Sequence, residues 1–404
     1  MAADSKFHAL VIGASGIIGW SVVDQLLQPY PSSSPFQKVT ALVNRPLELR
    51  DSFWSTGAAD RPELALVSGV DLLCGDAEFE DLLKEKVPDF RNVSHVYYFG
   101  KTQQGLFWPT GKLTTLVAAF KGDADYKREV EVNVGMMRRV VLAIKNLSPK
   151  FKFFVYPGGT RGYGIYEPNG VFAAPLIEEM ADNLPEACIE TVAYPHYRTM
   201  LTSESAGQSW TWCELVPDAI IGFTPNGSAF SLVGHWAVYL CVYAHVHGEG
   251  AEVPFPGTMA GYDSLYTESS AELLARVAIH ASLHPEQFRE RIFNVADTEK
   301  PGSMRERWPQ IASCFGLKGV EPLMTACMKP SHFIKEHASK LKEIGVKGVD
   351  IWNTEQLDSY GYWLTFDRHL SLKRLRDAGF EEVRSPENGW WTTFEMFRKA
   401  GMIT

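Results

Sequence analysis

The sequence lacks a long apolar run, a paired cysteine motif and a block of like charges. Its longest apolar stretch, residues 230–245, is interrupted by Gly234 and His235 and is too short and mixed for a membrane-spanning helix. The first ten residues contain no apolar signal segment. The six cysteines are far apart and form no CxxC pair, which argues against a zinc or other metal site and for reduced thiols. These absences predict a cytoplasmic protein without a membrane span.

Charge excludes another class of partner. With 39 Lys and Arg against 48 Asp and Glu, the net charge is −9 and no long run of either sign occurs, so the basic footprint of a nucleic-acid-binding protein is missing. A chain of 404 residues that is 45% hydrophobic can bury a sizeable core, as one large α/β domain or two packed domains. We expect a small-molecule partner, and a homodimer is compatible with this composition.

Short apolar runs alternate with helical patterns in the first half of the chain. Apolar residues recur at helical spacing over residues 18–27, 80–86 and 129–144, which predicts helices there. The expected strands are 7–12, 39–43, 64–67 or 70–74, 95–99, 151–156, 211–216 and 291–295. This alternation predicts an α/β Rossmann fold with a doubly wound parallel sheet. After residue 222 the alternation loosens, so we expect a Rossmann domain over 1–222 and a smaller, mostly helical lobe over 223–404, with the chain returning to the sheet near 291–297.

A glycine-rich turn, GASGIIG, follows the first expected strand. Gly13 permits a tight turn, Gly16 lets the backbone approach a pyrophosphate, and Gly19 lets the helix pack closely on the strand. The start of the helix then faces the phosphates. A plain tight turn is the alternative interpretation. The predicted dinucleotide contacts of this turn are Gly13, Ser15, Gly16, Ile17, Ile18 and Gly19.

The end of the second strand indicates which dinucleotide binds. An NAD enzyme usually has a carboxylate there, whereas Val43 is followed by Asn44 and Arg45. Arg45 can pair with a 2′-phosphate, so we predict NADP(H); a solvated surface arginine is the alternative. Asp76 falls where a carboxylate can contact the adenine amino group, or can cap the next helix. Pro217, after the sixth strand, completes the predicted cofactor contacts.

Groups able to do proton chemistry gather near the fifth and sixth strands. Arg161 and Tyr163 come just after the fifth strand, and Tyr194, His196 and Tyr197 precede the sixth. Ligands bind outside the carboxyl ends of such strands, so we predict that these segments form one crevice there. Its predicted catalytic residues are Arg161, Tyr163, Tyr194 and Tyr197. A nearby cation lets a tyrosine exchange a proton. Equally, these aromatic side chains could pack in the core while Arg161 pairs with an acid.

Aromatic residues near the fourth strand are candidates for an apolar substrate wall, namely Tyr98, Phe107 and Trp108. His196 and His235 are further candidates for substrate contacts. His235 lies in an apolar stretch, where a hydrogen-bonded core histidine is the more common outcome, and core packing is also the usual role of such aromatic residues.

Several motifs resemble one known family. The runs GASGIIG, VNRP, CGDA, EVNVGMMRRVV, TWCELVPDAIIGF, VPFPG and FNVAD are similar to the extended short-chain dehydrogenases, within them to the progesterone 5β-reductase/iridoid synthase-like group and its fungal secondary-metabolism members. The resemblance runs nearly end to end. It implies an NADP(H)-binding Rossmann domain and a C-terminal lobe that closes over an apolar substrate. In that family a lysine and a tyrosine polarise and protonate the oxygen of an enone or ketone.

This sequence departs from the family pattern at both of those positions. Arg161 stands where the TGxK(H/A)Y segment has its lysine, and Pro195 stands where the FYYxxxD segment has its catalytic tyrosine. Tyr194 keeps the first tyrosine of that segment, and Tyr197 lies two positions after the proline. Arginine keeps the charge but does not transfer a proton at working pH, and proline cannot donate.

Three functions therefore remain open. The first is a reductase of an enone on an apolar natural product, with Arg161 and Tyr194 or Tyr197 replacing the usual pair. The second is a non-redox cyclase, isomerase or aldolase-like enzyme that retains NADP(H) structurally. The third is a non-catalytic NADP(H)-binding regulator, against which the full-length C-terminal lobe argues. We expect the first, slightly ahead of the second, and reduction of a conjugated C=C bond rather than a simple ketone.

Overall fold

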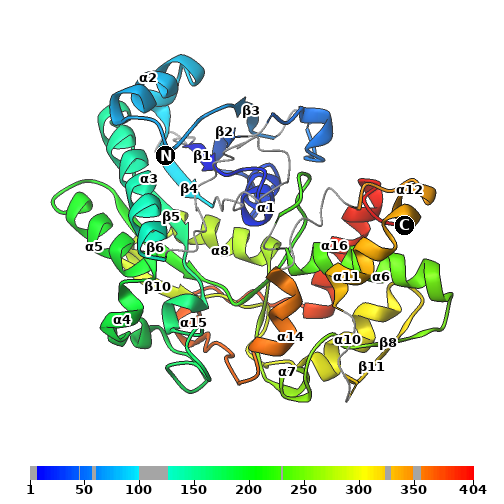
Figure 1. The fold of residues 1–404 in the computed structure, drawn as a ribbon. Helices are drawn as coiled ribbons and strands as arrows, with labels where there is room; N and C mark the ends of the chain where they lie inside the picture. The colour runs from blue at the N-terminus through cyan, green and yellow to red at the C-terminus, as the bar shows by residue number, and fades with distance from the viewer. Residues whose placement is uncertain are drawn as a thin grey trace.

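A seven-stranded parallel sheet forms the centre of the computed structural model (Figure 1). The structure describes residues 7–44, 46–56, 61–99, 126–228, 231–323, 329–348 and 356–404. The strand order is β10-β6-β5-β4-β1-β2-β3, and every neighbouring pair is parallel. The strands are β1 Phe7–Ile12, β2 Phe36–Val43, β3 Glu63–Ser68, β4 His95–Tyr98, β5 Phe153–Pro157, β6 Thr211–Val216 and β10 Arg291–Asn294. The predicted doubly wound Rossmann sheet is confirmed.

Successive strand residues point to opposite faces of the sheet, and helices cover both faces. Leu10 and Ile12 of β1 join one core cluster with helices α2 (Asp76–Lys86), α3 (Tyr126–Leu147) and α5 (Ala193–Ser205). Ala9 and Val11 join the other cluster, with α1 (Ile17–Leu26) and α8 (Ala271–Leu283), which pack against each other. This two-sided burial explains why the strands read as nearly continuous apolar runs.

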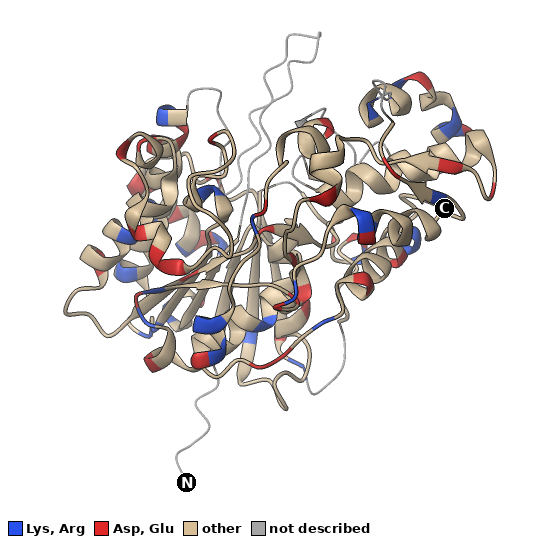
Figure 2. Cartoon of the chain, turned by 90° about the horizontal axis from the view of Figure 1, so that it is seen from below, with Lys and Arg blue, Asp and Glu red and all other residues tan. Residues whose placement is uncertain are grey.

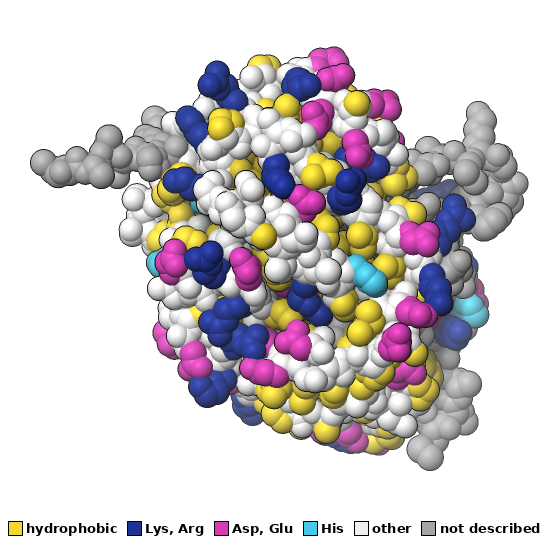
Figure 3. Space-filling model, turned by 90° about the vertical axis from the view of Figure 1, so that its left-hand side faces the viewer, with side chains coloured by type: hydrophobic (Ala, Val, Ile, Leu, Met, Phe, Trp, Pro, Cys, Tyr) yellow, Lys and Arg dark blue, Asp and Glu magenta, His cyan; other side chains and the backbone are white. Residues whose placement is uncertain are grey.

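Charged side chains lie mainly on the outer helices and loops, and the strands carry few of them (Figure 2). On the face seen in Figure 3, basic and acidic side chains are interspersed rather than gathered by sign. This agrees with the mixed charge pattern of the sequence.

A group of elements from the second half of the chain, which we call the C-terminal lobe, lies on the right of Figure 1 around an aromatic cluster. Trp236 packs against Trp308 and Trp390, whose ring centroids lie 5.3 Å and 5.8 Å, respectively, from that of Trp236. Its elements are α6 Leu232–His247, β8 Glu252–Pro254, α7 Met259–Asp263, α10 Met304–Ser313, β11 Lys318–Val320, α11 Pro330–Glu336, α12 Ala338–Glu343, α14 Tyr360–Trp363 and α16 Pro386–Lys399.

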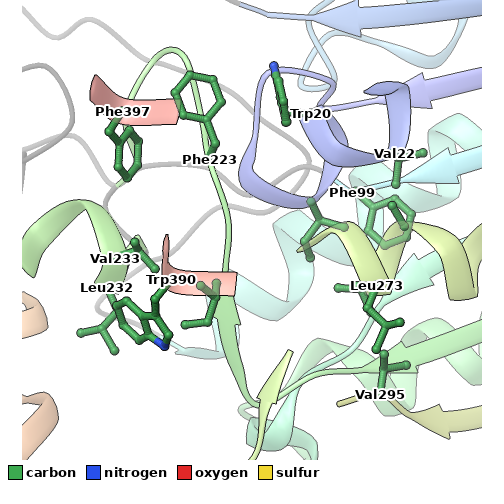
Figure 4. Close-up of a cluster of buried hydrophobic side chains, with 14 of the residues drawn as sticks. Trp20, Val22, Phe99, Phe223, Leu232, Val233, Leu273, Val295, Trp390 and Phe397 are labelled. Carbon is green, nitrogen blue, oxygen red and sulfur yellow. The ribbon is translucent and has the colours of Figure 1, made fainter. Parts of the chain in front are cut away.

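The lobe is joined to the sheet domain by a continuous apolar cluster (Figure 4). Phe223 lies 5.0 Å from Trp20 of α1 and 5.3 Å from Phe397 of α16 between ring centroids, so the side chains of both parts meet there.

Short elements complete the described chain. Strands β7 (Ala219–Ile221) and β9 (Glu268–Ser270) form a separate parallel pair, as do β8 and β11. The short helices are α4 Glu186–Ile189, α9 Pro285–Phe288 and α15 Lys373–Asp377, and the 3₁₀ turns are η1 Leu49–Asp51, η2 Phe90–Asn92, η3 Thr160–Tyr163, η4 Glu178–Asn183 and η5 Gln356–Ser359.

The chain returns to the sheet where the sequence predicts it, because β10 pairs with β6. Strand β3 takes the first of its two expected positions, and α2 begins four residues before the expected Glu80. The interrupted apolar stretch forms α6, which is largely buried in the C-terminal lobe. Across the described part of the chain, no helix has the length and apolar character needed to cross a bilayer. The division at residue 222 stays a prediction.

Candidate active site

The glycine turn has the geometry that the sequence predicts. Gly13 adopts a positive φ of 77°, and its carbonyl accepts from the Gly16 amide at 2.9 Å. A Cβ on Gly19 would lie 2.2 Å from the Gly13 oxygen, and one on Gly16 would lie 3.2 Å from it. Only glycine lets α1 approach the end of β1 so closely.

This turn fits a dinucleotide. No side chain caps the N-terminus of α1, and the first-turn amides of a helix, here including Ile17 and Ile18, have no acceptor within the helix. Such a helix start binds a pyrophosphate. Thr224 donates from Oγ1 to the Ser15 carbonyl oxygen at 2.9 Å, which fixes the turn against the segment that follows β7.

Two other predicted cofactor contacts lie at the same edge of the sheet. Asn44 directly follows β2, Pro217 directly follows β6 and is buried, and Arg45 lies outside the described residues. Asp76 is the first residue of α2, and its carboxylate lies 3.0 Å from Nε of Arg139. Because the N-cap of α2 is Gly75, the capping role considered for Asp76 is wrong, and the adenine contact stays a prediction.

Arg161 is held firmly in the turn η3 after β5. Its Nη1 donates to the Glu129 carboxylate at 2.5 Å, and its Nη2 donates to the Thr191 carbonyl at 2.6 Å. The rings of Tyr126 and Tyr166 lie 4.8 and 4.9 Å from the guanidinium carbon. The alternative in which Arg161 pairs with an acid is therefore what the structure shows. Nε is buried and has no partner among the described residues.

Tyr194 lies against the same turn. A Cβ on Gly159 would lie 3.1 Å from the Tyr194 hydroxyl, and one on Gly162 would lie 3.1 Å from the ring. These two glycines therefore make room for the tyrosine. Burial raises the pKa of Tyr194, and the nearby charge of Arg161 opposes that rise without reversing it. The hydroxyl is protonated at neutral pH and is able to donate.

Tyr163 and Tyr197 are not brought into this arrangement. Tyr163 is buried and donates to Oδ1 of Asn294 at 2.6 Å. Tyr197 lies in the core between the sheet and α3, with its ring 5.6 Å from that of Tyr156. Its buried hydroxyl has no partner within the described chain. Of the four predicted catalytic residues, the structure brings Arg161 and Tyr194 together.

Three of the five predicted substrate contacts lie in the described part of the chain, each with its own partner. His196 bonds the Ile189 carbonyl at 3.1 Å, and buried His235 lies 3.2 Å from Asp358, so His235 is a hydrogen-bonded core histidine. Tyr98 is buried and stacks on Phe154. Phe107 and Trp108 lie outside the described residues.

A cavity of about 430 Å³ adjoins Arg161. Sequence reasoning found only Arg161 among its lining residues, because the others come from separate segments and carry no shared local motif. They are Tyr126, Gly164, Tyr166, Glu167, Ala187, Cys188, Thr191, Val192 and Trp363. In the ranges that the structure describes, no group of three or more His, Cys, Asp or Glu residues is placed to hold a metal ion.

A buried ion pair links this region to the C-terminal lobe. Asp218, just after β6, accepts from Oγ1 of Thr160 at 2.9 Å and lies 3.2 Å from Nε of Arg368. The Arg368 guanidinium also donates to the Tyr360 hydroxyl at 2.8 Å. Thr160 precedes Arg161, so the ion pair fixes the turn on which Arg161 lies.

Comparison with known proteins places the chain in a family. The model of the PRISE-like Rossmann-fold domain matches residues 9–105 and 111–404. The chain is 32% identical over 407 residues to the short chain dehydrogenase ausT of Aspergillus calidoustus, covering 98% of this chain and 94% of that one. It is 23% identical over 404 residues to the 3-oxo-Delta(4,5)-steroid 5-beta-reductase of Arabidopsis thaliana, covering 96% and 91%.

The fold has counterparts among solved structures. The GDP-mannoheptose C4 reductase from Campylobacter jejuni, with NADP bound, has a TM-score of 0.56 and 14% identity, with 98% of each chain covered. The glycine turn, the sheet order and the match over nearly the whole length agree with one another. The chain belongs to the PRISE-like Rossmann-fold family, within the extended short-chain dehydrogenases/reductases.

Proposed function

We propose that the protein is an NADP(H)-dependent reductase of an enone on an apolar natural product. The observation that carries this proposal is the approach of Tyr194 to the turn that holds Arg161, next to an aromatic cavity that Arg161 lines, in a domain whose glycine turn fits a dinucleotide. The naming of similar proteins as short chain dehydrogenases and a steroid 5-beta-reductase supports it.

The roles of the two residues follow from their surroundings. When bound, NADPH supplies a hydride. Arg161 supplies a fixed positive charge near the substrate oxygen, where an enolate carries negative charge. Tyr194 holds a proton at its hydroxyl and is the candidate donor. Because Glu129 offsets part of the Arg161 charge, we expect reduction of a conjugated C=C bond, which needs less acid assistance at oxygen than reduction of a ketone.

The choice of NADP(H) over NAD(H) rests on the sequence after β2. No carboxylate directly follows Val43, and Arg45 is available for a 2′-phosphate. A charge-assisted contact of this kind is worth about 1.5–3 kcal/mol, or about ten- to a hundredfold in affinity. The solved reductase that shares the fold has NADP bound, which supports the same choice.

The test is to follow the hydride. Purified protein is incubated with an enone and NADPH that carries deuterium on the transferred position, in parallel with labelled NADH. We expect deuterium in the product, an equal amount of NADP⁺, and weaker use of NADH. Equal use of both cofactors would contradict the NADP(H) assignment.

A second candidate function is a non-redox isomerase or cyclase that uses the same cavity. It is favoured by two features: Arg161 is already paired with Glu129, and Pro195 occupies the position of the family's donor tyrosine. Product that forms without deuterium and without NADPH oxidation would establish this second function and exclude the reductase.

A further inference from the structure

The cavity beside Arg161 has an aromatic rim. Tyr126, Tyr166 and Trp363 line it, and they remain 45%, 40% and 37% exposed. The centroids of the Tyr166 and Trp363 rings are 4.7 Å apart, and those of Tyr126 and Tyr166 are 6.4 Å apart. The three residues come from α3, the segment after η3, and α14, so tertiary folding alone gathers them. Exposed aromatic side chains around a cavity mark a binding surface for apolar rings.

The charges around the cavity do not favour an anion. The Arg161 guanidinium lies 2.5 Å from the Glu129 carboxylate, which offsets part of its charge. A second carboxylate, Glu167, lines the cavity itself. An anionic ligand in the cavity would meet the Glu167 carboxylate and a cation whose charge Glu129 partly offsets. The cavity therefore favours a neutral ligand.

We infer that the substrate is a neutral molecule whose enone is conjugated to a flat aromatic ring, and that Tyr166 and Trp363 select this ring. The inference rests on the proposed function, because it takes the cavity as the substrate site. Its volume of about 430 Å³ lies within the range of about 300–1,000 Å³ that is usual for small-molecule sites. Glu167 and the partly offset charge of Arg161 disfavour sugar nucleotides and carboxylic acids.

The test measures binding without reduction. Dissociation constants are determined by calorimetry for the full chain saturated with NADP⁺, which cannot donate a hydride. The probes are benzylideneacetone, its cyclohexyl analogue 4-cyclohexylbut-3-en-2-one, and cinnamate. We expect benzylideneacetone to bind about tenfold more tightly than either comparison compound, because ring contacts are worth about 1.4 kcal/mol.

Variants show whether the rim is responsible. W363A is expected to weaken benzylideneacetone binding about tenfold. W391A is the matched control, because Trp391 is 42% exposed and lies on α16 away from the cavity. Y166L provides an independent test should W363A fold poorly. Equal affinity for the aromatic and cyclohexyl probes, or unchanged binding in both rim variants, would overturn the inference.

The two proposals fail in different ways. Absence of deuterium transfer to any enone, with ring-dependent binding intact, refutes the reductase and supports the ligand class. Deuterium transfer to 4-cyclohexylbut-3-en-2-one, with no preference for the aromatic probe, supports the reductase and refutes the ligand class.

Discussion

Tyr194 and Tyr197 are three residues apart in α5 and lie on the same face of that helix, but their hydroxyl groups meet different surroundings. The hydroxyl of Tyr194 approaches Gly159, next to the turn η3 that holds Arg161, whereas the hydroxyl of Tyr197 is buried in the core without a partner among the described residues. At the scale of single residues, these surroundings separate a candidate donor from a packing residue that the sequence alone does not distinguish.

We expect Y194F to lower the turnover of an enone substrate by about 10²-fold, because a positioned acid contributes about 10²–10⁴-fold. Y197F should keep its turnover and gain up to about 1 kcal/mol of unfolding free energy, because it removes a buried hydroxyl that lacks a hydrogen bond. Steady-state kinetics and urea unfolding of both variants check this. Equal losses of turnover in the two variants would contradict the assignment of Tyr194.

At the scale of elements, close packing of α1 on β1 depends on one glycine. We expect G19A to lower both the NADPH affinity and the melting temperature, because the added Cβ would lie 2.2 Å from the backbone oxygen of Gly13. The matched control is G135A in the interior of α3, where a Cβ would meet nothing within 4 Å.

G135A should stabilise the protein by about 0.5–1 kcal/mol, because alanine is the better helix former. Thermal unfolding and NADPH titration of both variants provide the measurements. A G19A variant with an unchanged melting temperature and NADPH affinity would contradict this, because α1 would then accommodate the added Cβ without loss of stability.

Elements with strong local signals were predictable, and those set by tertiary contacts were less so. The strand–turn–helix of residues 7–26 follows from an apolar run, three glycines and helical spacing. The choice between two apolar runs for β3 depended on pairing with β2, and Gly69, with a φ of +73°, ends the strand before the second run. The start of α2 at Asp76 was missed because its first turn is acidic rather than apolar.

The site was predictable only in part for the same reason. Arg161 and Tyr194 lie in segments that local sequence ties to the sheet edge. Trp363 reaches the cavity from a segment about two hundred residues further along the chain, and no local pattern marks it. Tyr163 and His235 have side chains that are common in active sites. In the structure both are buried in the core, where Tyr163 is hydrogen-bonded to Asn294 and His235 to Asp358.

At the scale of the whole molecule, buried Arg368 connects the C-terminal lobe to the sheet domain. It lies 3.2 Å from Asp218, and its guanidinium carbon is 5.0 Å from the centre of the Tyr266 ring. Burial raises the pKa of Asp218, and the charge of Arg368 is the main influence that opposes this rise. Asp218 in turn accepts from Thr160, so the pair lies between the two lobes and next to the turn that carries Arg161.

We expect R368M to lower the unfolding free energy by about 3–5 kcal/mol, because it leaves the Asp218 carboxylate buried without its cation. The loss depends on pH. Without Arg368 the folded-state pKa of Asp218 rises further above its ordinary value, so the native state holds a proton that the unfolded state releases. Stability is then retained at acidic pH and falls as pH rises through the folded-state pKa.

The double variant D218N/R368M removes both charges and should recover much of the loss at neutral pH. Urea unfolding of the wild type and both variants at acidic and neutral pH measures these differences. A loss that is the same at both pH values, or that the double variant does not reduce, would show that Arg368 acts through its packing on the tyrosine rings rather than through its charge.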